Sequence, residues 1–376
     1  MLAATVMLGH FSAFYSYHLP FLLYGSAAVP AFYIISGFLI TLVLHEKYHD
    51  KLVLFYSNRA LRIFPLYWAA LIVFLAVNWL VVGGRPPEPT PAYQNTSALW
   101  WAKEHGGGVG ALQVALLAIT NIFILGQDLI LRIGRWPHLA TPDYFYHFFI
   151  FVGPAWTIAV ELWFYALAPF LVRGKAIWAV SVLSLSLAAR AFAIGLGHTE
   201  FIVDYSFLPF ELAFFMAGSL GYRAYVRLRA SDSGMVPAYV VASCTAMALL
   251  TIFYLRLPLA RPIYLLATCI CLPGIVLAGG RNPLDNIFGE LSYPIYLLHP
   301  IFTIFIVPGA TIAAEIVAVC GTLALSLSLI HLVERPVVRY RRLRVMGADR
   351  RQRPISVPVR ITSRKERSKA RDPSRS

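Results

Sequence analysis

Long apolar runs separated by short polar connections fill most of the chain up to residue 334. A helix of about 20 apolar residues is long enough to cross the hydrocarbon core of a bilayer. Eleven segments approach that length, at about 1–24, 25–45, 64–83, 110–127, 148–172, 176–197, 205–222, 236–255, 262–280, 287–307 and 309–332. The pattern predicts an all-α polytopic membrane protein.

The basic residues between these segments test the count, because cytoplasmic loops of membrane proteins are enriched in Lys and Arg. They follow the second, fifth, seventh and ninth segments: Lys47, Lys51, Arg59, Arg62; Arg173, Lys175; Arg223, Arg227, Arg229; and Arg281. Three crossings between Arg62 and Arg173 would place Arg173 outside. We therefore interpret 110–127, which is short and contains Gln113, as a re-entrant or surface helix. About ten spans remain, with both termini cytoplasmic.

The composition agrees with a bilayer environment, and the excess of basic residues lies mostly at the C-terminal end of the chain. Hydrophobic residues make up 59% and charged residues 13% of the chain, whereas soluble domains have about 25% charged residues. Of the net charge of +14, residues 335–376 contribute fifteen Lys and Arg against three acids. We expect a membrane domain over 1–334 and a basic, disordered cytoplasmic tail over 335–376, lying against anionic lipid headgroups. No folded basic module accompanies the tail, so no nucleic-acid partner is expected.

The stretch from Phe55 to Trp68 lies where one apolar run ends and another begins. Arg59 and Arg62 are three residues apart and share one face of a helix. Pro65 suits the first turn of the next span. One interpretation is a positive flank of that span. The other is a pair of guanidinium groups that binds an anion such as a phosphate.

Two ionisable residues inside predicted spans are candidates for chemistry, because such residues are costly in a bilayer. His10 either forms a hydrogen bond to a neighbouring helix as a neutral imidazole or acts as a general base toward a hydroxyl group. Glu161 needs a partner or a wet cavity. It either orients His10, binds a sugar hydroxyl or pairs with an arginine of another span. Tyr165 lies one turn further on the same face.

Further polar residues in apolar runs have weaker interpretations. The Ser36-Gly37 pair permits close helix packing, and a serine nucleophile lacks the Gly-x-Ser-x-Gly turn. A second polar cluster ends at His299, whose role stays open, and Glu211 is another acid within a span. The cysteines form no C-x-x-C pair and no histidine cluster occurs, so no metal site is expected.

These residues alone leave two classes of function open. An enzyme could join a cytosolic anionic donor to a hydroxyl acceptor, with the arginine pair holding the donor and His10 or Glu161 serving the acceptor. A proton-coupled small-molecule transporter or exporter would use the same buried His and Glu for proton movement. Composition does not choose between them.

The motifs, taken in order, resemble the acyltransferase-3 family of bacterial integral membrane acyltransferases, which modify polysaccharides, lipopolysaccharide, Nod factors and antibiotics. The matching residues are His10; Phe32 to Thr41; Phe55-Tyr56, Arg59, Arg62-Ile63, Pro65 and Tyr67-Trp68; Trp156-Thr157, Glu161, Phe164-Tyr165 and Pro169; Ser292-Tyr293, Tyr296 and His299; and Glu334 with Pro336. One such motif is weak evidence, but five or six in order are specific.

The resemblance implies an O-acyltransferase of the bacterial inner membrane that moves an acyl group, usually acetyl, from cytosolic acyl-CoA to a carbohydrate or glycolipid. It implies that Arg59 and Arg62 bind the donor phosphates, that His10 deprotonates the acceptor and that Glu161 assists. The family usually carries an arginine upstream of the histidine, at a position that falls before Met1. We therefore expect either residues upstream of Met1 or an inactive family member.

Overall fold

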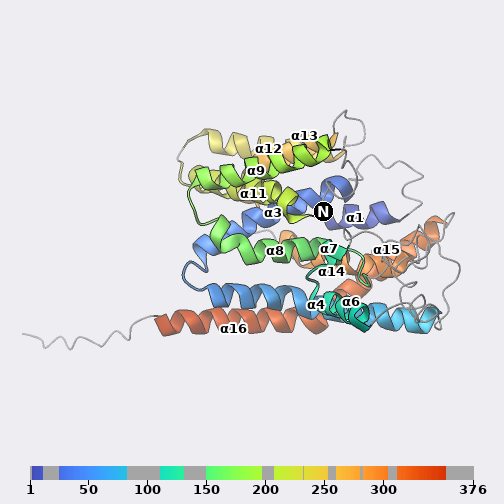
Figure 1. Cartoon of the computed structure of the whole chain (residues 1–376). Helices are drawn as coiled ribbons and strands as arrows, with labels where there is room; N and C mark the ends of the chain where they lie inside the picture. Colours follow the sequence, from blue (N-terminus) through green and yellow to red (C-terminus); the bar gives the residue numbers. More distant parts are fainter. Residues whose placement is uncertain are drawn as a thin grey trace, which may run out of the picture.

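In the computed structural model, a bundle of packed helices forms the protein (Figure 1). The described residues are 2–11, 25–82, 111–130, 150–196, 207–231, 233–252, 260–279, 283–303 and 311–352, and among them no strand occurs. The elements are α1 (Leu2–His10), α3 (Gly25–Glu46), α4 (Leu52–Val82), α6 (Ala111–Phe123), α7 (Gln127–Ile130), α8 (Ala155–Leu171), α9 (Ala176–Gly195), α11 (Leu208–Arg229), α12 (Met235–Ile252), α13 (Ala260–Ala278), α14 (Pro283–Thr303), α15 (Ile312–Leu329), a π-helical turn (Ile330–Glu334) and α16 (Arg335–Gln352). The prediction of an all-α protein is confirmed.

The outside of the bundle is apolar, which identifies lipid as its surroundings. Large hydrophobic side chains such as Leu80, Phe170, Leu185 and Phe192 are each at least 70% exposed. Patches of this kind are rare on soluble monomers. Five helices of the described residues are long and apolar enough to cross a membrane, and α8 and α12 are shorter apolar helices. The protein is therefore a multi-pass membrane protein.

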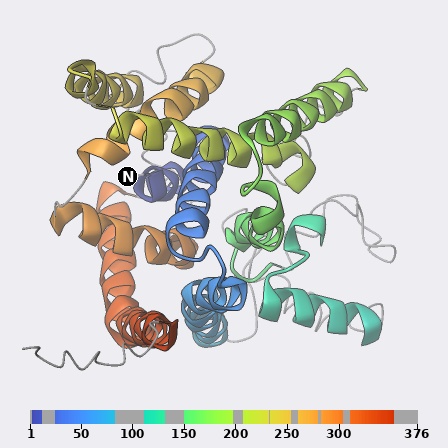
Figure 2. The same ribbon diagram turned by 90° about the vertical axis from the view of Figure 1, so that its left-hand side faces the viewer.

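Helix α3 lies inside the bundle, surrounded by the other helices in the end-on view (Figure 2). Its small residues let α11 approach closely. A methyl group built on Gly37 would lie 2.0 Å from the carbonyl oxygen of Phe215, and one built on Gly218 would lie 1.9 Å from that of Ile34. The prediction that Ser36-Gly37 permits close helix packing is confirmed, and this contact fixes the position of Ser36.

The connections that carry basic residues gather at one end of the bundle, to the left in Figure 1. They join α3 to α4, α8 to α9 and α11 to α12, as the charge pattern predicts. Arg223 Nη2 donates a hydrogen bond of 3.1 Å to the carbonyl of Val172, and Arg229 lies 3.9 Å from the carboxylate of Glu46. We call this the basic end of the bundle.

Helix α4 is longer than the predicted span of 64–83, and it begins at Leu52. Arg59 and Arg62 therefore lie within a continuous helix. Pro65 lies inside this helix, so the prediction that a new helix starts at Pro65 is wrong. A 31-residue helix is about 46 Å long, more than a bilayer core needs. The first turns of α4 thus extend toward the basic end.

Helix α6, within the predicted segment 110–127, has 13 residues, too few to cross a bilayer. It ends where Ile124 and Gly126 adopt positive φ angles of 68° and 88°. Asn121 is buried, and its side-chain oxygen accepts a hydrogen bond of 3.0 Å from the Phe151 amide. The carbonyl of Asn121 accepts a 2.5 Å hydrogen bond from the Tyr67 hydroxyl. Packing against α4 thus satisfies the polar end of this helix.

The polar segment that follows the last span is ordered as far as Gln352. Residues 335–352 form α16, so the expectation of disorder is wrong for this part, and 353–376 lie outside the described residues. Helix α16 runs beside α4 in both views (Figures 1 and 2). Val337, Val338, Arg341, Arg344 and Val345 are all partly buried, a spacing of three, four and seven residues that marks one helix face. The high net positive charge of this segment predicted disorder, but net charge is an average over both faces of the helix and does not show that one face packs against α4.

Candidate active site

His10 lies at the end of α1 and contacts His299 of α14. The two ring nitrogens His10 Nδ1 and His299 Nε2 are 2.7 Å apart, and the ring centroids are 4.9 Å apart with 27° between the ring planes. His299 is fully buried, whereas His10 is exposed. The imidazole pair thus has one fixed member inside the bundle and one member that a substrate can reach.

The hydrogen bonds around His299 assign the tautomers of both rings. His299 Nδ1 is 3.1 Å from the carbonyl oxygen of Ile295. A carbonyl oxygen only accepts, so Nδ1 of His299 carries hydrogen and Nε2 of the neutral ring accepts. His10 Nδ1 must then donate to His299, which leaves the lone pair of the His10 ring on Nε2. This arrangement suits His10 to accept a proton.

Glu161 of α8 is bound by two hydroxyl groups. Ser36 of α3 donates a hydrogen bond of 2.7 Å to Glu161 Oε1, and the Tyr165 hydroxyl donates to the same oxygen. Glu161 is partly buried. The sequence suggested that Glu161 could orient His10. In the structure His299 contacts His10 instead, and the described hydrogen bonds of Glu161 lead to Ser36 and Tyr165.

Helix α14 carries polar groups that reach both the histidine pair and α8. The Tyr296 hydroxyl lies 2.7 Å from the hydroxyl of Thr157, and the rings of Tyr296 and His299 are 6.2 Å apart. Tyr293 donates a hydrogen bond of 3.1 Å to the carbonyl of Ile63 on α4. Tyr293 and Tyr296 both lie within electrostatic range of Glu161. The late motif of the sequence therefore connects α1, α4 and α8.

Arg59 and Arg62 differ in their surroundings. Arg59 is 8% exposed, and its guanidinium carbon lies 5.8 Å from the ring centroids of both Phe55 and Tyr165. Arg62 is exposed. Both lie within electrostatic range of Tyr165, the residue that donates to Glu161. A series of neighbouring polar groups thus leads from the arginines through Tyr165 to Glu161.

Glu211, the other acid in an apolar run, belongs to a separate region. It is fully buried on α11, and its carboxylate lies 3.5 Å from Arg190 of α9. The Arg190 guanidinium also lies 5.3 Å from the ring centroid of Phe214. This ion pair joins α9 to α11, so we assign it a structural role.

Three contacts of the site could not be inferred from the sequence. Ser36 as a partner of Glu161, His299 as the partner of His10, and Thr157 as the partner of Tyr296 all join helices distant in the chain. The only sequence signal was the presence of polar residues in apolar runs, which marks a residue without naming its partner.

A family model described as an acyltransferase domain, of the acyltransferase-3 type, matches residues 1–333. This range includes His10, Arg59, Arg62, Glu161 and His299. Comparisons with curated proteins and with solved structures gave no match.

Proposed function

Because the chain belongs to the acyltransferase-3 family, we propose that this acyltransferase transfers an acyl group, most simply acetyl, from cytosolic acyl-CoA to a hydroxyl group of a carbohydrate or glycolipid. The observation that carries the proposal is the pair of His10 and His299, which leaves Nε2 of an accessible histidine free of hydrogen. A hydroxyl acceptor needs such a base, because a neutral alcohol is a weak nucleophile.

The proton and the acyl group balance in one cycle. His10 Nε2 takes the proton of the acceptor hydroxyl while its oxygen attacks the thioester carbonyl. The carbon–sulfur bond then breaks, and the leaving thiolate of CoA recovers the proton from the His10 imidazolium. His299 Nε2 accepts the Nδ1 hydrogen of His10 throughout, so it orients the ring and stabilises its positive charge.

The arginines support a phosphate-bearing donor. Guanidinium groups bind phosphate oxygens through paired N–H donors. Arg59 and Arg62 lie on the half of α4 that extends toward the basic end, and Tyr165 connects them to Glu161. The donor nucleotide would bind at the arginines, with its thioester directed into the bundle toward His10, and Glu161 would bind the donor arm or the acceptor hydroxyl.

This arrangement needs the basic end to face the cytoplasm of a bacterial cell. The proposed topology has about ten spans in the inner membrane, with both termini cytoplasmic. It rests on the positive-inside rule and on the three basic connections at one end. In this orientation CoA reaches Arg62 from the compartment in which CoA is made.

A proton-coupled transporter is the alternative from another class, since it also uses a histidine and an acid within its membrane spans. A transporter has no need for a CoA site at Arg59 and Arg62. An inactive family member is a second alternative, and it would bind CoA without turnover.

The test is the binding of acetyl-CoA to the purified protein in nanodiscs, measured by isothermal titration calorimetry for wild type and for the Arg59→Ala/Arg62→Ala variant. We expect binding by wild type and a loss of at least a hundredfold in the variant, because two charge-assisted contacts are removed. A folded wild-type protein that binds no acetyl-CoA would refute the donor and favour the transporter.

His10→Ala separates an enzyme from an inactive relative. We expect its turnover, measured as release of CoA thiol in the presence of carbohydrate acceptors, to fall by about 10²- to 10⁴-fold, the usual contribution of a general base. Its affinity for acetyl-CoA should stay within about twofold of wild type, since His10 is not a phosphate ligand. Unchanged turnover in His10→Ala would contradict the assignment of the base.

A further inference from the structure

Helix α16 follows the range matched by the family model and presents two arginines to α4. Its partly buried face includes Arg341 and Arg344, while Arg339 and Arg342 are exposed outside that face. Arg344 Nη2 donates a hydrogen bond of 3.0 Å to the hydroxyl of Ser57, which lies just before Arg59 on α4. The two helices therefore bring basic side chains from distant parts of the chain together.

Arg341 lies within electrostatic range of both Arg59 and Arg62. Like charges that act on one another repel, and bringing them together is unfavourable unless opposite charge is supplied. Glu334 is within range of Arg62 and Arg341, yet among the described residues no carboxylate lies within 4.0 Å of any of the three arginines.

The buried donors of this cluster point to a ligand. In the described part of the chain, the Nε atoms of Arg59 and Arg341 are buried and have no hydrogen-bond partner. A buried donor without a partner costs free energy, so each such group calls for an explanation such as a bound water or ion. An anion with several oxygen atoms would satisfy both the donors and the charge.

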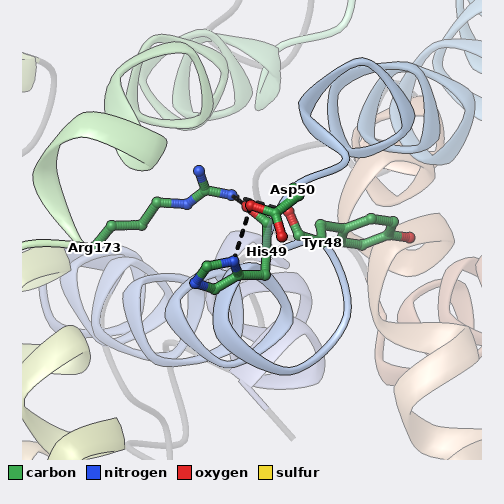
Figure 3. A network of polar contacts seen from close by, with 4 residues as sticks. All are labelled: Tyr48, His49, Asp50 and Arg173. Atoms are coloured by element: carbon green, nitrogen blue, oxygen red, sulfur yellow. Dashed lines mark hydrogen bonds and ion pairs between the residues drawn. The ribbon is translucent and has the colours of Figure 1, made fainter.

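A cleft of about 630 Å³ lies beside the cluster at the basic end. Its wall is formed by residues 49–54 together with Arg173 and Arg344. Arg173 donates a hydrogen bond of 2.9 Å to the carbonyl of Tyr48 and another to that of His49, which holds the connection between α3 and α4 in place (Figure 3).

Basic groups outnumber acidic ones around the cleft. Lys51, Arg173 and Arg344 line it, against the single acid Asp50, whose carboxylate is 3.0 Å from His49 Nδ1. Arg344 lies on the same helix face as Arg341, one turn further along α16, so the cleft continues the arginine cluster.

We propose that Arg341 and Arg344 of α16 complete the donor site, with the CoA diphosphate on Arg59, Arg62 and Arg341 and the 3′-phosphate in the cleft beside Arg344. The inference rests on the proposed function, because it takes acyl-CoA as the donor. CoA carries a diphosphate and a separate phosphate monoester on one nucleotide, and the protein offers two adjoining basic sites. Helix α16 then makes the segment that follows the acyltransferase domain part of substrate binding.

The test compares CoA with 3′-dephospho-CoA, using the full chain in phosphatidylcholine nanodiscs. For wild type we expect affinity for dephospho-CoA about tenfold below that for CoA, the effect of one charge-assisted contact at a half-exposed site. Arg344→Gln should lower affinity for CoA by the same factor and leave affinity for dephospho-CoA unchanged, because the lost arginine and the lost phosphate are partners. Arg341→Gln should weaken both ligands about equally.

Arg339→Gln and Arg342→Gln are matched controls, since they remove the same charge from the exposed face of the same helix. We expect both to bind CoA as wild type does. Normal CoA binding by Arg341→Gln and Arg344→Gln, together with its loss in Arg59→Ala/Arg62→Ala, would overturn this inference and leave the proposed function intact. An absence of CoA binding in wild type would overturn both.

A lipid headgroup is the other phosphate-bearing ligand that Arg341 and Arg344 could bind in place of CoA. In nanodiscs that also contain phosphatidylglycerol, a lipid site would appear as a loss of thermal stabilisation by that lipid in Arg341→Gln and Arg344→Gln, with affinity for CoA unchanged. That result would overturn the assignment to CoA. We expect the reverse pattern, in which the two variants lose affinity for CoA and respond to phosphatidylglycerol as wild type does.

Discussion

Two acids within apolar helices of this protein, Glu161 and Glu211, have opposite surroundings. Glu211 is fully buried and paired with Arg190, so its charge is compensated by another span. Glu161 is partly buried and accepts hydrogen bonds from Ser36 and Tyr165, which are neutral donors. The first arrangement joins two helices, and the second leaves the carboxylate on hydroxyl groups, without an arginine among the described partners. The partners of an intramembrane acid therefore separate a structural role from a functional one better than its burial does.

Breaking the ion pair gives the largest expected effect. Arg190→Met leaves the carboxylate of Glu211 buried without its arginine, and losing one partner of a buried pair costs about 3–5 kcal/mol. We expect a marked loss of thermal stability in detergent, with binding of acetyl-CoA unchanged below the unfolding temperature. Adding Glu211→Gln to this variant removes the carboxylate charge and should restore part of the stability. Wild-type stability in Arg190→Met would contradict the structural role.

Substitutions of His299 should change the turnover of the enzyme rather than its stability. His299→Leu removes the acceptor of the His10 Nδ1 hydrogen, and we expect turnover to fall about a hundredfold with KM nearly constant, as for other positioning residues. His299→Gln supplies a side-chain carbonyl as a substitute acceptor, and it should recover about tenfold of that loss. The measurement is steady-state kinetics of thiol release. Equal turnover in the two variants would show that the hydrogen bond to His10 does not matter.

Neutralising Glu161 gives the smallest expected effect. Glu161→Gln retains an oxygen that accepts from Ser36 and Tyr165 but loses the charge that strengthens both bonds. We expect turnover to fall about tenfold and the free energy of unfolding to change by less than about 1 kcal/mol. Glu211→Gln is the matched control, and it should change stability more than turnover. The opposite pattern would reverse the roles assigned to the two acids.

The sequence determined most of the apolar helices, the membrane environment and the basic end of the bundle. Each of these follows from local composition, because a span needs about 20 apolar residues and basic residues favour one side of the membrane. His10, Glu161, Arg59 and Arg62 were also identifiable, since ionisable residues stand out in apolar runs. The order of the motifs along the chain was enough to identify the family, because motif order depends on the residues alone.

Only the tertiary structure decided the partners of these residues. His10 and His299 are 289 positions apart, and Ser36 and Glu161 are 125 apart, so no periodicity within one helix relates them. Their contacts depend on which helix faces meet, and close approaches such as that of Gly37 to Phe215 set those faces. The same reason applies to α16: composition describes its mean charge, whereas packing against α4 selects the face that carries Arg341 and Arg344.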